Sequence, residues 1–176
     1  MSFIPEYKSK TYYASTTVTV ASSATDIFEI FGDGSKRIRI KSIELQGVAT
    51  ASAAQKYDIV KRTAKDTGGT ATNPSIISAQ NTNDYTRSTA TLKNYSANPT
   101  AGAITLGGGT IKSGYIPAGV TATGIPHRIY HNFADGINVE SPVLNVSTES
   151  IGIHLGGSSA AGLVVTVSIV WTEEEQ

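Results

Sequence analysis

Apolar and polar residues alternate along much of the chain, and this pattern predicts β-strands. The segment Lys36–Leu45, KRIRIKSIEL, opens with Ile38 and Ile40 separated by cations. Side chains of a strand repeat every two residues, so the isoleucines share one face and the cations the other. The parity then changes, because Ile43 and Leu45 are odd-numbered. An extra residue at Lys41–Ser42, a β-bulge, keeps all four apolar side chains on the inner face.

The N-terminal half contains further strand patterns around this bulged strand. Thr11–Val20 is rich in β-branched and aromatic residues, and Asp26–Phe31 is a short apolar run. Asp33-Gly34 follows it, and this dipeptide predicts a hairpin over Thr25–Leu45. Tyr57 and Ile59 begin another alternating strand, which we expect beside the bulged strand in the middle of an antiparallel sheet.

The clearest pattern in the C-terminal half is a predicted hairpin. Ile151–Leu155 and Leu163–Trp171 both alternate strictly, with Trp171 on the core face, and Glu173–Glu175 is expected to end the last strand. Shorter strands are expected within Arg87–Tyr95, Ala103–Ile111, Arg128–Phe133 and from Pro142 to Val146.

Turn-forming segments separate these strands. Pro117-Ala118-Gly119 and Gly124-Ile125-Pro126 bracket a predicted loop. The polar stretch Arg62–Thr86 is too long for an ordinary connection. We expect that stretch to contain a short strand or to form a functional surface loop. No window has helical periodicity, so about ten short strands predict an all-β fold. The sequence therefore indicates an antiparallel β-sandwich, jelly-roll-like, over residues 11–176, preceded by an N-terminal arm over residues 1–10.

Composition narrows the function classes. The net charge is zero and only 16% of residues are charged, which argues against nucleic-acid or anionic-membrane binding. Residues 1–100 carry 12 Lys and Arg against 8 Asp and Glu, whereas residues 101–176 carry 2 against 6. We expect the two halves to interleave within one fold, and pairing between neighbouring subunits is the alternative.

Neither a targeting signal nor a thiol site is expected. The chain has no cysteine, its first residues lack the apolar run of a signal peptide, and no stretch reaches transmembrane length. We therefore expect a protein that is made in the cytoplasm and leaves the cell only in a particle or by lysis.

Motifs for catalysis are not found in the sequence. His127 and His131 are four residues apart, but on a strand this spacing spans roughly 13 Å, too far for one metal ion. His154 alternates with an apolar set and is expected on the surface. There is no G-x-S-x-G elbow, and Asp33, Asp66 and Asp135 are expected to cap local turns. We predict no catalytic residues, no cofactor and no metal.

Two features indicate a protein interface. The row Arg37, Arg39 and Lys41 forms one strand face, for which a solvated surface and a partner contact are both open. The arm contains Phe3, Ile4 and Tyr7, which is too apolar for a segment that only contacts water. We expect the arm to lie against a neighbouring subunit or another protein of a larger assembly; the alternative is that it folds back onto its own sandwich.

Four further motifs of the sequence are structural rather than catalytic: Val60-Lys61-Arg62, Asp66-Thr67-Gly68-Gly69-Thr70, Tyr95-Ser96-Ala97-Asn98-Pro99-Thr100 and Trp171-Thr172-Glu173-Glu174. Through these motifs the sequence resembles a group of phage and prophage virion-associated proteins with a jelly-roll-like β-fold. The resemblance implies a virion structural protein, and we expect a capsid decoration protein that binds the major capsid protein or other virion proteins. A homo-oligomer, with a trimer favoured, fits this interpretation.

A second interpretation stays open. A carbohydrate- or receptor-binding β-sandwich, on a tail fibre or free, requires exposed aromatic side chains. The chain offers four scattered tyrosines for such a platform: Tyr85, Tyr95, Tyr115 and Tyr130.

Overall fold

Twelve β-strands, and no helix, form the regular structure of the part of the chain described by the computed structural model. This part covers residues 9–23, 25–74, 77–80, 87–105, 108–120, 128–133, 140–156 and 158–176. The strands are β1 (Lys10–Thr19), β2 (Asp26–Phe31), β3 (Lys36–Ala49), β4 (Ala53–Arg62), β5 (Thr70–Thr72), β6 (Ser78–Ala79), β7 (Thr91–Ala97), β8 (Gly109–Val120), β9 (Arg128–Asn132), β10 (Val143–Leu144), β11 (Ser150–Leu155) and β12 (Val164–Glu175).

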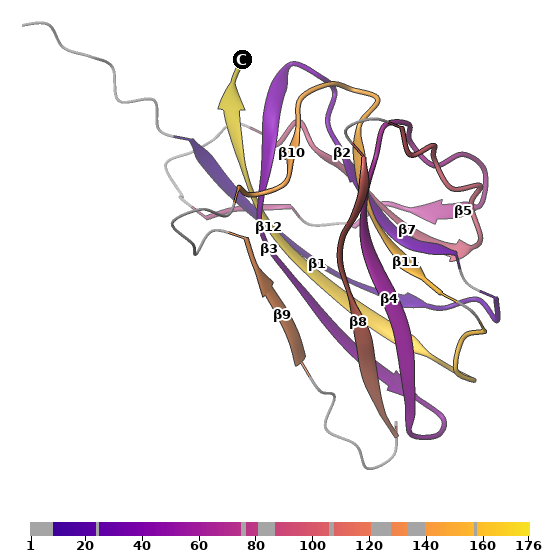
Figure 1. Ribbon diagram of the computed structural model, residues 1–176. Coiled ribbons are helices and arrows are strands. Elements are labelled where there is room, and N and C mark those ends of the chain that lie inside the picture. Colours follow the sequence, from indigo (N-terminus) through magenta and orange to yellow (C-terminus); the bar gives the residue numbers. More distant parts are fainter. Residues whose placement is uncertain are drawn as a thin grey trace, which may run out of the picture.

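These strands form one strongly curled mixed sheet with two halves, as Figure 1 shows. Sheet A has the order β6-β1-β12-β3, and β9 and β10 also pair with β3. Sheet B has the order β5-β7-β2-β11-β4-β8. The halves join where β8 pairs with the end of β3, and this is a parallel pairing, unlike the others. The predicted all-β sandwich class is confirmed, with this one exception to antiparallel pairing.

The core lies between the two halves and is built from the alternating positions. Ile38, Ile40, Ile43 and Leu45 of β3 are all fully buried, as predicted from their parity. Trp171 of β12 is also fully buried, and its ring stacks on Tyr12 with 5.7 Å between centroids. Burying one large apolar side chain stabilises the fold by about 1.5–3 kcal/mol, so this interior row is a major source of stability.

The predicted bulge in β3 is confirmed. Val170 pairs with Ser42 and the next residue, Trp171, pairs with Ile40, so Lys41 is the extra residue. The Lys41 carbonyl accepts a hydrogen bond from the backbone N–H of Phe133 at 2.8 Å. The bulge therefore preserves the inward face of β3 and also anchors the end of β9.

Both predicted hairpins are wrong. Strand β2 pairs with β11 and β7 in sheet B, whereas β3 pairs with β12 in sheet A. The Asp33-Gly34 turn therefore carries the chain from one sheet to the other, with Gly34 at φ +87° and Asp33 Oδ1 accepting the Ser35 N–H. Strands β11 and β12 likewise lie in different sheets. Alternation specifies which face of a strand is buried, but it does not specify the partner strand.

Three other expectations about strands and loops can be compared with the structure. Strands β3 and β4 are not neighbours, because β8 lies between them in the sheet order. Pro117-Ala118-Gly119, one end of the predicted loop, lies within β8, where Pro117 pairs with Ala54, and the other end, Gly124-Ile125-Pro126, lies outside the described residues. The long stretch Arg62–Thr86 does contain short strands, β5 and β6, as expected.

We predict that β3 tolerates a one-residue deletion at the bulge but not in its regular part. Removing Lys41 leaves Ile40, Ser42 and Ile43 in regular alternation, so the variant should fold at a cost of about 1–2 kcal/mol for the lost local hydrogen bonding. Removing Glu44 puts either Ile43 or Leu45 on the wrong face and should unfold the protein. Chemical denaturation of both variants checks this, and equal stability of the two deletions would contradict it.

Candidate functional site

A buried ionic cluster on the outer face of sheet B is the most concentrated set of functional groups in the described structure. Its centre is Asp26 of β2, which accepts two hydrogen bonds from the Arg62 guanidinium of β4, each at 2.8 Å. Both side chains are buried. His154 of β11 lies with Nδ1 2.6 Å from Asp26 Oδ1. Asp26 thus lies between a cation and an imidazole on two different strands.

Glu29 and Asp66 extend the cluster. Glu29 accepts hydrogen bonds from the Tyr95 hydroxyl at 2.9 Å and from the backbone N–H of Asp66 at 2.8 Å. Asp66 Oδ1 accepts the Gly102 N–H at 2.8 Å and lies 3.6 Å from Arg62 Nε. The cluster therefore contains three carboxylates, one guanidinium and one imidazole.

A second bulge explains why Asp26 and Glu29 face the same way. In β2, Phe28 pairs with Ile153 and Asp26 pairs with His154, so Ile27 is an extra residue. The bulge reverses the parity beyond Ile27 and brings the two carboxylates onto the outer face of sheet B.

Two chain segments, residues 63–69 and 98–105, close over this face, and we call them the cover. They pair with each other through Thr67 and Thr100, whose N–H and carbonyl groups bond in both directions at 2.7 and 3.0 Å. Arg62 Nη1 donates to the Gly102 carbonyl at 3.0 Å. Every residue of β2 is buried, because the core covers one face and the cover and cluster occupy the other.

Burial and charge move the two aspartate pKa values in opposite directions. Burial alone raises the pKa of Asp26, but the His154 hydrogen bond and the Arg62 charge outweigh it and hold that pKa below its ordinary value. Burial, helped by the charge of Asp26, raises the pKa of Asp66 to about 7.

Two sequence expectations are wrong at this cluster. His154 is not a surface residue but half-buried against Asp26. Asp66 does not cap a local turn, since it bonds to Gly102 in the other segment of the cover. The signal that could have revealed the cluster is a pair of carboxylates, Asp26 and Glu29, in an otherwise apolar strand.

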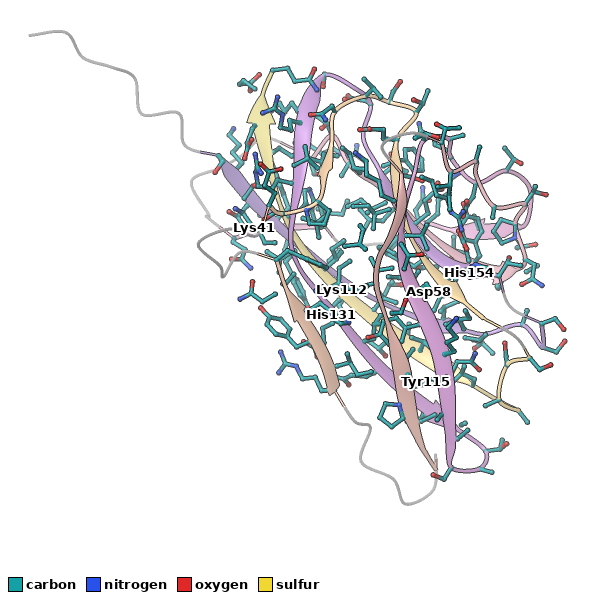
Figure 2. The ribbon with its side chains drawn as sticks, viewed as in Figure 1. Lys41, Asp58, Lys112, Tyr115, His131 and His154 are labelled. Carbon is teal, nitrogen blue, oxygen red and sulfur yellow. The ribbon has the colours of Figure 1, made fainter. Side chains whose placement is uncertain are left out.

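His131 faces the core and contacts Tyr57 across the sandwich. Its Nε2 lies 2.6 Å from the Tyr57 hydroxyl, and its ring stacks on Phe133. Figure 2 shows Lys112 close to His131 between β8 and β9, and its charge acts on the imidazole. Burial, together with Lys112, lowers the pKa of His131, while burial raises the pKa of Tyr57. His127 lies outside the described residues.

Gly114 makes room for Tyr57 in this arrangement. The two residues are directly paired across β4 and β8. A Cβ atom at Gly114 would lie 2.8 Å from the Tyr57 hydroxyl and 3.0 Å from its ring. A side chain at this position would therefore push Tyr57 away from His131.

The predicted cationic row lies on the outer face of sheet A, and acidic residues of β12 neutralise part of it. Arg39 forms a bidentate pair with Glu174 at 2.8 and 3.2 Å, and Arg37 Nε donates to the Asn145 side chain at 3.0 Å. The Arg39 hydrogen bond lowers the pKa of Glu174. Lys41 is half-buried and forms no ion pair within 4.0 Å in the described part of the chain.

The last acidic residues do not end β12, contrary to expectation. The strand continues through Glu175, which lies 3.5 Å from Lys36. Glu173 is buried and accepts hydrogen bonds from the Thr89 N–H at 2.9 Å and the Ser88 hydroxyl at 2.5 Å. Pairs such as Arg39–Glu174 show that the two charge halves of the sequence interleave within one chain.

The structure describes only some of the remaining predicted residues. Phe3, Ile4, Tyr7, Tyr85 and Asp135 lie outside the described residues. Tyr95 is buried in the ionic cluster and cannot contribute to an exposed platform. Tyr115 and Tyr130 are exposed, but register places them on the outer faces of different sheets.

Comparison with known protein families and with curated proteins found no match to this sequence. Among the described residues there is no cluster of three or more His, Cys, Asp or Glu arranged to hold a metal ion. In the same residues, no helix has the length and hydrophobicity needed to span a membrane.

We predict that His131 makes folding pH-dependent. Its pKa in the folded protein is below the ordinary value near 6.5, so the unfolded chain takes up the proton first as the pH falls. The contribution of neutral His131 is fully present above about pH 6.5 and is lost as the pH falls below it. The difference in unfolding free energy between wild type and His131→Gln should therefore shrink from pH 7 to pH 5. A difference that does not change with pH would contradict this assignment.

Proposed function

We propose that the protein is a structural component of a bacteriophage particle, and that it decorates the head by binding the major capsid protein. The observation that carries this proposal is the position of the first residues of β1 relative to the cationic row. Lys10, the first residue of β1, pairs with Glu173, which itself pairs with Ile38 between Arg37 and Arg39. Strand β1 therefore begins at the same end of sheet A as the cationic row, with β12 between them.

In this proposal the interface has two parts, the cationic row and the arm that precedes β1 in the sequence. An arm with Phe3, Ile4 and Tyr7 supplies apolar anchors, and Lys41 supplies a positive charge without an internal ion pair within the described residues. Apolar anchors beside charged groups are a common composition for protein interfaces. The sandwich acts as a rigid support, and we include a homo-oligomer, with a trimer favoured, in the proposal.

An experiment with purified capsids of the same phage tests the proposal. Deleting residues 2–8 should abolish co-sedimentation with capsids while the thermal unfolding of the sandwich is unchanged. Lys41→Glu should weaken binding about tenfold, because it reverses a charge at the contact. Lys112→Glu, an exposed lysine on β8, is the matched control and should bind as wild type does.

Two outcomes would contradict the proposal. One is full capsid binding by the arm deletion combined with Lys41→Glu. The other is loss of thermal stability in the arm deletion, which would mean that the arm packs on its own sandwich. Light scattering of the purified protein tests the expected oligomer.

Carbohydrate or receptor binding is the second candidate, and one surface favours it. Tyr130 is exposed on β9, and the Arg128 guanidinium lies 5.5 Å from its ring centroid. Arg128 also pairs with Glu44 at 2.6 Å, and Glu44 accepts a hydrogen bond from Gln46. Glycan binding that is lost in Tyr130→Ala, without capsid binding, would favour this candidate over head decoration.

A further inference from the structure

The ionic cluster contains more negative than positive groups in a closed space. Asp26, Glu29 and Asp66 are buried, and one buried guanidinium, that of Arg62, faces them. The only other group able to carry positive charge among the cluster residues is half-buried His154. Unpaired charge inside a protein is costly, and a carboxylate in that position takes up a proton instead.

Asp66 is the carboxylate of the cluster that has a buried oxygen without a hydrogen-bond partner in the described structure. Its Oδ1 accepts the Gly102 N–H, but its Oδ2 is buried and has no hydrogen-bond partner in the described structure. A negative oxygen without a donor is unfavourable, whereas a protonated one can donate.

The titratable and charged side chains around Asp66 lie on four different strands of sheet B. Asp26 and Glu29 lie on β2, Arg62 on β4, Tyr95 on β7 and His154 on β11. Next to Asp66 in the cover, Lys65 points elsewhere: its Nζ lies 3.9 Å from the centroid of the Phe31 ring, near Lys93.

We infer that Asp26 and Asp66 together hold one proton in the closed protein, and that losing this proton to solvent releases the cover from sheet B. Polar contacts attach the cover to sheet B: the Asp66 N–H donates to Glu29, and Arg62 donates to the Gly102 carbonyl, while the Gly102 N–H donates to Asp66 and joins the two segments of the cover. Ionisation of Asp66 places a further negative charge beside Asp26 and Glu29, and this repulsion opposes the closed arrangement of the cover on sheet B.

The pH range follows from the direction of the shift. The pKa of Asp66 is about 7 in the folded protein, against 3.8 ordinarily, so the closed state binds the proton more tightly than the open one. The stabilisation is fully present below about pH 4 and is lost as the pH rises to about 7. The cover therefore opens more readily at neutral and alkaline pH than in mild acid.

Native-state amide hydrogen exchange tests this inference. After correction for intrinsic exchange rates, protection of the backbone amide of residue 66, which donates to Glu29 of β2, should fall by about tenfold per pH unit from pH 5 to pH 7 and then level off. The Val167 amide in the centre of sheet A should not show this slope.

Variants show whether the pH dependence comes from ionisation of Asp66 or of a neighbouring group. Asp66→Asn cannot ionise, so its cover should stay protected with no slope in this range. Asp58→Asn is the matched control, because Asp58 lies on the same face of β4 but bonds to Ser113, outside the cluster, and it should keep the wild-type slope. If Asp66→Asn does not fold, the side-chain ¹³C shift of Asp66 in the wild type gives the same information.

Three results would overturn the inference. They are a slope that persists in Asp66→Asn, a slope that disappears in His154→Gln but not in Asp66→Asn, and an Asp66 carboxyl that titrates near 3.8 in the wild-type protein. Titration of that carboxyl near 7 would support it.

Discussion

The buried pair between Asp26 and Arg62 is the interaction on which the rest of sheet B depends. It joins β2 to β4 across β11, and the same guanidinium holds the Gly102 carbonyl of the cover. Burying two charges is expensive, and only bidentate geometry with further hydrogen bonds offsets the cost. Without this pair, the cover would have to close over an uncompensated carboxylate. The outer face of β2 would then remain exposed to water.

The sequence predicts which residues are buried better than which strands are neighbours. Ile38, Ile40, Ile43 and Leu45 all point inward, and the parity change between them correctly locates the bulge at Lys41. Pairing partners were predicted less well, because neighbouring strands such as β11 and β12 join different sheets. A local pattern of side chains contains no information about this crossover.

The candidate site was the least predictable part, for a physical reason. Asp26, the nearby pair Arg62 and Asp66, and His154 come from three separate places in the sequence, and each alone looks like an ordinary surface or turn residue. Their environment is created by the cover, whose own fold depends on contacts between residues 63–69 and 98–105. The charge row at Arg37 and Arg39 was visible in the sequence, but its neutralisation by Glu174 depends on the register of β12.

A double-mutant cycle on Asp26 and Arg62 tests most directly whether a charge pair organises this half of the protein. Asp26→Asn and Arg62→Met should each lower the unfolding free energy by about 3–5 kcal/mol, since each leaves a buried partner unpaired. The double variant should cost at least about 2 kcal/mol less than the sum of the two. Additive losses, with a coupling below about 0.5 kcal/mol, would contradict the account and would mean that the cover is held by packing rather than by charge.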